Sequence, residues 1–377
     1  MSISTFQLWN RSFGWGVFSL ALLTYMLTVE PTASFWDAGE YIATAAKLQV
    51  GHPPGAPLFQ MIGAFFALFA TSSENIALMV NHMSVFSSAF TILFLFWTLT
   101  LLMKKLPAFE TLDKTAERLT FFGSAAVGAL AFCFSDSFWF NAVEAEVYAM
   151  ATFILSLLFW LGLRWEQDMN TPRGDRWLLL ISFVIGLSFG VHFMGLLTIP
   201  AIGMIYYFKN TPKVTFKGFM IANGVSVAVL LFIFKLLLPT TLAFFGNAEV
   251  FFVNKMGLPF NSGTLIAGFI ILLFFYYTLR YTQQKKWINF NTIILCVLFV
   301  LVGFSSWLMI PIRANANTVI NENAPTDARA LLAYYNLEQY PETHLFYGPL
   351  FSDVYAGQDE TAPYVDDKPK YERDYKT

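Results

Sequence analysis

Long apolar stretches separated by short polar segments run through most of the chain. A helix that crosses a bilayer needs about 20 mainly apolar residues. Eight stretches approach or exceed that length: 13–29, 78–103, 119–134, 143–163, 177–208, 218–245, 263–279 and 287–310. The stretch 177–208 is too long for one pass and contains several glycines and a proline, so we divide it into two short helices that meet near His192. The pattern predicts an all-α, polytopic membrane helix bundle with about nine crossings.

One further apolar segment, 58–70, is short and follows three prolines. We therefore use the distribution of basic residues among the loops to decide whether it crosses the membrane. If it does not cross, four loops on one side carry 13 basic residues, while the short loops on the other carry only Lys47 and Lys255. This bias fits the positive-inside rule, and a crossing at 58–70 would reverse it. We therefore expect 58–70 to be a re-entrant or interfacial helix on the outer side.

The same charge bias divides the chain into two parts. We expect residues 1–312 to form the transmembrane domain, with a cytoplasmic N-terminus and a large outer loop at 31–77. The polar segment 313–377 should lie on the outer side as an extracytoplasmic tail, and we expect it to be the start of a larger soluble domain.

Composition narrows the class of protein. The chain is 56% hydrophobic and 13% charged, whereas soluble domains average about 25% charged residues. This excludes most water-soluble folds and a disordered chain. A net charge of −2 gives no reason to expect nucleic acid as a partner. The four histidines have no metal-ligand spacing, and no phosphate-binding glycine loop occurs, so neither a metal site nor an ATP-driven pump is indicated.

The first outer loop contains an acidic segment. Residues 34–49 have a helical, amphipathic pattern that places Asp37 and Glu40 on one polar stripe, with an apolar side suited to the membrane interface. Two interpretations remain open. Ser34 could cap the helix with Asp37 in a capping-box position, or the two carboxylates could be catalytic.

A histidine–proline turn follows twelve residues after Glu40 and favours the catalytic interpretation. In His52-Pro53-Pro54-Gly55, the two prolines forbid a helix and fix an extended turn, and the glycine permits close approach of another group. His52 is thereby held at a rigid corner, where it could donate a hydrogen bond to a phosphate.

A second acidic segment lies at the outer end of the fourth predicted crossing. On a continuous helix, Asn141, Glu144 and Tyr148 share one face. Glu146 would point about 200° away from Glu144, so the two acids could not face the same partner. Ionisable groups at membrane depth are functional candidates, which makes Glu144, Glu146 and Tyr148 candidates for substrate or phosphate binding. The alternative is a solvated helix end among the lipid headgroups.

Three cationic or titratable residues occupy the remaining apolar regions. Lys235 could bind an anionic ligand or extend its stem to the interface. His192 could bind a ligand or be a structural histidine at a hairpin tip. Arg313 follows the last crossing, where its guanidinium could clamp a phosphate or reach lipid headgroups.

Taken together, these motifs resemble the GT-C class of membrane glycosyltransferases, in particular the protein O-mannosyltransferases. The sequence at 35–40, Phe-Trp-Asp-Ala-Gly-Glu, and at 50–59, Val-Gly-His-Pro-Pro-Gly-Ala-Pro-Leu-Phe, is most similar to a bacterial "protein O-mannosyltransferase-like" branch, the glycosyltransferase family 117 type. The segments 138–148 and 310–317 also look like that branch.

The resemblance implies an enzyme of the bacterial inner membrane that works on the extracytoplasmic side. It would pass a sugar from a polyprenyl-phosphate donor to a hydroxyl acceptor on protein or glycan. Asp37 would be the base, with Glu40 orienting the acceptor or sharing the proton, although the two residues between them leave open which one is the base. His52, His192, Lys235 and Arg313 would supply phosphate contacts. No cofactor is certain, and dependence on a divalent metal or on a protein partner is left open.

Two other functions compete with this one. A transporter or flippase for a lipid-linked substrate should show pseudo-symmetric halves and acids near the bilayer midplane, but the hydropathy pattern has no such halves and the acids cluster at the outer end. A non-catalytic membrane component of an envelope complex would not depend on Asp37 or Glu40.

Overall fold

The computed structural model describes residues 3–109 and 111–341. Within these residues every regular element is helical, and the one sheet-like feature is an isolated bridge between Val50 and Asn321. The predicted all-α class is confirmed.

The first half of the chain is built from seven α-helices and two 3-10 turns. These are α1 (Ile3–Thr28), α2 (Ala38–Lys47), α3 (Pro57–Ala67), η1 (Ser73–Asn75), α4 (Ile76–Met103), η2 (Pro107–Phe109), α5 (Thr115–Cys133), α6 (Asp136–Ala142) and α7 (Val147–Asp168). The second half contains α8 (Asp175–Ser188), η3 (Phe193–Leu197), α9 (Thr198–Asn210), α10 (Phe216–Leu231), η4 (Phe232–Leu237), α11 (Leu238–Val250), η5 (Phe251–Lys255), α12 (Ser262–Gln284), α13 (Ile288–Phe304), η6 (Ser305–Leu308), α14 (Met309–Ala314) and α15 (Ala328–Tyr335).

Several helices are long and apolar enough to cross a membrane. By length and composition, five helical stretches of the described residues qualify, or six if α5 and α6, which meet at a 70° bend, form one broken span. The chain is therefore a multi-pass membrane protein. As predicted for 177–208, two short helices of 14 and 13 residues, α8 and α9, are separated by a turn at His192. The count of nine crossings stays a prediction.

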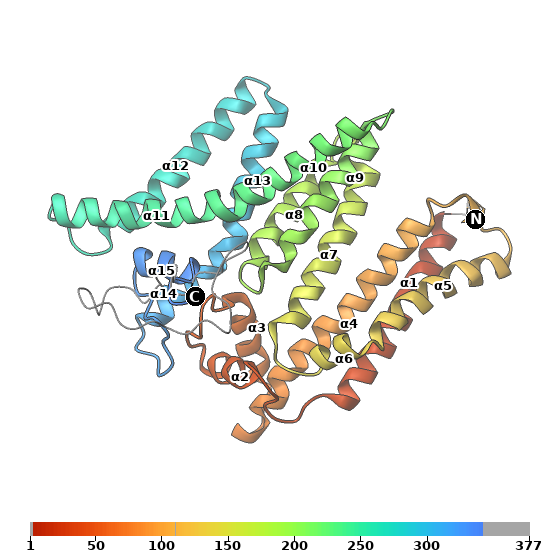
Figure 1. Cartoon of the computed structure of the whole chain (residues 1–377), viewed down its shortest axis with the longest axis horizontal. Helices are drawn as coiled ribbons and strands as arrows, with labels where there is room; N and C mark the ends of the chain where they lie inside the picture. The colour runs from red at the N-terminus through yellow and green to blue at the C-terminus, as the bar shows by residue number, and fades with distance from the viewer. Residues whose placement is uncertain (1–2, 110, 342–377) are drawn as a thin grey trace, which may run out of the picture.

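The two ends of the bundle differ in what they carry. Figure 1 shows α2, α3, α14 and α15 gathered at one end, while the N-terminus and the α4–α5 and α12–α13 connections lie at the other. The acidic loop and these basic connections are thus at opposite ends, which is the arrangement that the charge bias requires.

The two helices between α1 and α4, α2 and α3, pack differently. The apolar side of α2, which the sequence suits to the membrane interface, is buried in the protein: Tyr41, Ile42 and Ala45 belong to the larger hydrophobic core. In contrast, α3 and the turn that follows it leave Phe65 and Leu68 exposed. The difference arises because α2 is covered by α3 and α4, so only α3 keeps an apolar side free for lipid.

The helices α10 to α12 contrast with the core of the bundle. In the spans 216–255 and 262–284, 17% of the apolar window is buried inside the protein, against 56% in the span that contains α4. Apolar side chains left uncovered to this extent are suited to lipid contact.

Candidate functional site

The acidic segment begins with an irregular loop. Helix α2 starts at Ala38 rather than near Ser34, because Trp36 has φ +60°, a left-handed conformation that interrupts the helix. Asp37 takes the N-cap position without a side-chain capping bond, and the Ser34 hydroxyl donates to the Glu144 carboxylate. The hypothesis that Ser34 caps this helix is therefore wrong.

Asp37 and Glu40 converge on the imidazole of His52. Glu40 Oε1 accepts the backbone N–H of His52 at 2.7 Å, and Glu40 Oε2 lies 3.0 Å from His52 Nδ1. The other ring nitrogen, Nε2, is 3.7 Å from Asp37 Oδ2. The structure thus places one histidine between the two carboxylates that share the predicted polar stripe.

The pair formed by Glu40 and His52 shifts the pKa of each partner. The hydrogen bond from the His52 side chain lowers the pKa of the Glu40 carboxyl, and the same bond raises the pKa of His52. Both changes favour the ionised pair around neutral pH. The Asp37 side chain is 58% exposed, which leaves it the more accessible of the two α2 carboxylates.

The second acidic segment lies in a break between two helices. Helix α6 ends at Ala142 and α7 begins at Val147, so the 100° spacing of a continuous helix does not apply to Glu144 and Glu146. The prediction that these two acids cannot face one partner is therefore wrong. Both line a single cavity of about 310 Å³, whose other walls are Trp36, Asp37, Phe140, Asn141 and Tyr148.

The carboxylates of this cavity sit in a less polar setting than Glu40. Glu146 is 5% exposed and its Oε1 has no hydrogen-bond partner among the described residues. Burial, reinforced by the negative charges of Asp37 and Glu144, raises the pKa of Glu146 to about 7. Burial also raises the pKa of Glu144, against the hydrogen bond from Ser34. None of the residues that line the cavity is a lysine or an arginine.

Arg313 lies in α14 and is engaged by the end of α2. Its guanidinium donates to the backbone carbonyl oxygens of Leu48 and Lys47, where α2 ends. Cations stabilise helix C-termini in this way. The structure thus gives this side chain a backbone partner near the site, outside the acidic cavity.

The other two candidate cations occupy different places. Lys235 lies in η4 with its Nζ 4.8 Å from the centre of the Phe234 ring, and it is not among the cavity residues. His192 is closer: its ring centre lies 5.5 Å from that of Tyr148, and its Nδ1 accepts the backbone N–H of Met194. His192 therefore stands beside one wall of the cavity.

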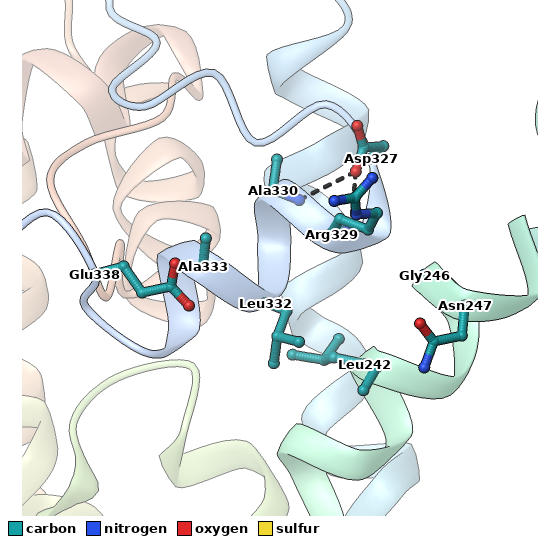
Figure 2. Close-up of a pocket in the computed structure, with 10 residues that line it drawn as sticks. Leu242, Gly246, Asn247, Asp327, Arg329, Ala330, Leu332, Ala333 and Glu338 are labelled. Carbon is teal, nitrogen blue, oxygen red and sulfur yellow. Dashed lines mark hydrogen bonds between the residues drawn. The ribbon is translucent and has the colours of Figure 1, made fainter. Parts of the chain in front are cut away.

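A larger cavity lies elsewhere in the protein. It measures about 450 Å³ and opens between α11 and α15, with Leu242, Asn247 and Arg329 among its walls (Figure 2). None of the residues singled out by the sequence lines it. Among the described residues, no group of three or more histidine, cysteine, aspartate or glutamate side chains could hold a metal ion.

The sequence does not assign a role to every residue of the site. Trp36 and Phe140 lie in the motif segments 35–40 and 138–148, but nothing in the pattern predicts that they form aromatic walls of the smaller cavity. Tyr334 donates to the carbonyl oxygen of Gly51 from 283 positions away. The nearest signal in the sequence is Gly55, which permits a close approach without identifying its partner.

Comparisons with known proteins agree with the motifs. Residues 37–215 match the family model described as the protein O-mannosyl-transferase TMEM260 N-terminal domain. The chain is 25% identical over 196 residues to protein O-mannosyl-transferase tmem260 of Dictyostelium discoideum, and 30% identical over 176 residues to protein O-mannosyl-transferase TMEM260 of Mus musculus. These segments cover 49% and 46% of this chain but 22% of the length of each relative.

No solved structure matches the chain. The range matched by the family model contains Asp37, Glu40, the histidine turn and the second acidic segment. The resemblance to the protein O-mannosyltransferases that the motifs indicate is therefore confirmed.

Proposed function

We propose that the chain is a membrane glycosyltransferase that transfers a sugar from a polyprenyl-phosphate donor to a hydroxyl group of a protein or glycan acceptor. The observation that carries this proposal is the cavity in which Asp37 meets two further carboxylates and three aromatic rings, without any lysine or arginine. The similarity of the chain to protein O-mannosyl-transferases also supports sugar transfer to a hydroxyl group.

The cavity suits a sugar better than a phosphate. Carboxylates accept hydrogen bonds from hydroxyl groups but repel a phosphate. Trp36 and Phe140 offer apolar surfaces to the C–H face of a ring. We therefore assign Glu144, Glu146 and Tyr148 to the hydroxyl groups of the transferred sugar or acceptor, rather than to the phosphate.

Asp37 is the proposed general base. In the transfer, the acceptor oxygen forms a bond to the anomeric carbon, the bond from that carbon to the phosphate oxygen breaks, and the acceptor proton passes to Asp37. The polyprenyl phosphate leaves with the bonding electrons. Glu40 fixes His52 beside Asp37, and the raised pKa of His52 favours its protonated form next to the base.

Contacts to the leaving phosphate have to come from the rim of the cavity. His52 and His192 are our candidates because the first reaches Asp37 and the second packs on Tyr148. Arg313 and Lys235 remain weaker candidates, since the first is bonded to the end of α2 and the second lies over Phe234.

The orientation in the membrane is part of the proposal. The clustering of α2, α3, α14 and α15 opposite the basic connections supports an extracytoplasmic site and a cytoplasmic N-terminus (Figure 1). We place the chain in a bacterial inner membrane because its motifs at 35–40 and 50–59 resemble a bacterial branch. Cysteine labelling from each side, with single cysteines at exposed Glu74 and at Lys285, tests the sidedness directly. Labelling of the first position from the cytoplasmic side would overturn it.

The donor class is tested with the wild-type chain in lipid nanodiscs. A polyprenyl-phosphate hexose and a nucleotide-activated hexose are offered separately with serine- and threonine-containing peptides and with a glycan acceptor. We expect transfer from the lipid-linked donor alone. Transfer from the nucleotide sugar alone, or from neither, would contradict the proposal, and movement of the intact lipid donor across the membrane would identify a flippase instead.

A further inference from the structure

The segment that follows α14 returns to the acidic loop and binds it along consecutive residues. Ile320 donates its N–H to Gln49 Oε1 at 2.8 Å and accepts the N–H of Val50 at 3.2 Å. The N–H of Glu322 then donates to the carbonyl oxygen of Val50 at 3.1 Å. Tyr334 of α15 completes the set at Gly51. We call 315–335 the clamp segment, and it lies outside the range 37–215 that the family model matches.

The bond from Tyr334 acts on one particular peptide group. The carbonyl of Gly51 and the N–H of His52 belong to the same planar unit. Its oxygen accepts the Tyr334 hydroxyl, and its N–H donates to Glu40 Oε1 at 2.7 Å. Fixing the oxygen therefore fixes the direction of the N–H, and with it the carboxylate that also holds the His52 ring.

The two glycines that flank His52 show how closely this unit is packed. A Cβ added to Gly55, which has φ +73°, would overlap the Tyr334 hydroxyl. A Cβ added to Gly51 would come 2.7 Å from Glu40 Oε1. Tyr334 is 1% exposed, so its hydroxyl has no solvent to replace the bond.

We propose that Tyr334 is a positioning residue for His52 and Glu40, and that the clamp segment is a working part of the acidic site. The inference rests on the proposed function for its catalytic meaning, but the geometry can be tested without activity. Tyr334 acts on the site through the peptide group between Gly51 and His52. It is not among the residues that line the acidic cavity.

The adjacent tyrosine supplies a matched control. Tyr335 is 6% exposed and its hydroxyl donates to the carbonyl oxygen of Phe234 at 2.9 Å, in η4 and away from the histidine turn. Tyr334→Phe and Tyr335→Phe therefore each remove one buried hydrogen bond from α15, and only the first removes it from the His52 peptide.

The test measures the pKa of His52 in the full chain in nanodiscs, by deuterium exchange at the imidazole Cε1 position with mass spectrometry. The groups that face His52 are Glu40, Asp37 and Glu322, with the Tyr41 ring 5.6 Å away. Loosening the peptide weakens the bond to Glu40, so Tyr334→Phe should lower the pKa of His52 by about half a unit or more, while Tyr335→Phe should leave it unchanged.

An unchanged pKa in Tyr334→Phe, or an equal fall in both variants, would overturn the inference. Where the wild type transfers sugar, Tyr334→Phe should lower kcat several-fold with little change in KM and should shift the histidine limb of the pH profile. If the wild type transfers nothing, the proposed function fails while the pKa comparison still decides the role of Tyr334.

Discussion

Two acidic groups face the same site from environments of opposite character. Glu40 is joined to His52 through both its oxygens, and its pKa is lowered. Glu146 is buried with an unpartnered oxygen, and its pKa is raised to about 7. Neighbouring carboxyl groups whose pKa values are driven apart are typical of sites that must both accept and hold protons. The comparison teaches that each acid is governed by its own surroundings: a hydrogen-bonded histidine lowers the pKa of Glu40, whereas burial beside other carboxylates raises the pKa of Glu146.

Among the variants that test this comparison, replacing Glu40, the acid with the lowered pKa, should have the largest effect on the rate of sugar transfer. In Glu40→Gln the His52 ring loses its carboxylate partner and Asp37 loses a fixed neighbour. We expect sugar transfer to fall about 100-fold, the cost of a small misplacement in a catalytic site. The measurement is kcat at pH 7, with Glu74→Gln, an exposed position, as control. A rate within twofold of wild type would remove Glu40 from the mechanism.

Removing the charge of Glu146, the acid with the raised pKa, should stabilise the protein at alkaline pH. The pKa of Glu146 rises from 4.5 to about 7 on folding, so in this pH range the unfolded chain binds fewer protons and stability falls as the pH rises. Glu146→Gln avoids that loss, and we expect a gain on the order of 2 kcal/mol at pH 8.

The gain in Glu146→Gln should vanish below pH 4.5, where the carboxyl is protonated in both states. Urea or thermal unfolding of both proteins in the same detergent across this pH range measures it. A constant difference at all pH values would show that packing, not charge, is responsible.

The pair of Glu40 and His52 should give a stability maximum at intermediate pH instead of a steady fall. The raised pKa of His52 gives a contribution that is full below pH 6.5 and is lost as the pH rises through that raised pKa. The lowered pKa of Glu40 gives one that is full above pH 4.5 and is lost as the pH falls through that lowered pKa. The pair should therefore stabilise most between pH 4.5 and 6.5, by about 1 kcal/mol. The difference in unfolding free energy between wild type and His52→Asn isolates it, and a flat difference would refute it.

The aromatic wall should matter least. Trp36 is 87% exposed and borders the cavity, so Trp36→Ala should weaken the hold on a sugar ring without moving the acids. We expect KM to rise about fivefold with kcat nearly unchanged, corresponding to roughly 1 kcal/mol of lost contact. Phe35→Ala, at an exposed neighbour that does not line the cavity, should change neither constant.

The sequence predicted the parts of this site that follow from local pattern. Apolar length indicated the membrane helices, and the prolines after His52 indicated a fixed turn. Helical periodicity failed where the helix is not continuous: at Ser34, because Trp36 interrupts the helix, and at Glu144 and Glu146, because α6 and α7 break between them. A period holds only while the backbone keeps its dihedral angles.

The remaining features depend on contacts between distant segments. The Arg313 guanidinium is bound to the end of α2, and Tyr334 to Gly51, across more than 260 positions in each case. No spacing rule connects such residues. A single sequence therefore indicates which side chains are unusual but not which of them meet.

The most direct measurement of the central claim compares two aspartates at the same end of the bundle. Asp37 lines the acidic cavity, whereas Asp136 is exposed at the start of α6 and does not. With a polyprenyl-phosphate hexose and a hydroxyl acceptor, Asp37→Asn should reduce transfer by about 10²–10⁴-fold, and Asp136→Asn should retain the wild-type rate at equal expression. Transfer that persists in Asp37→Asn, or is lost equally in both variants, would contradict the account.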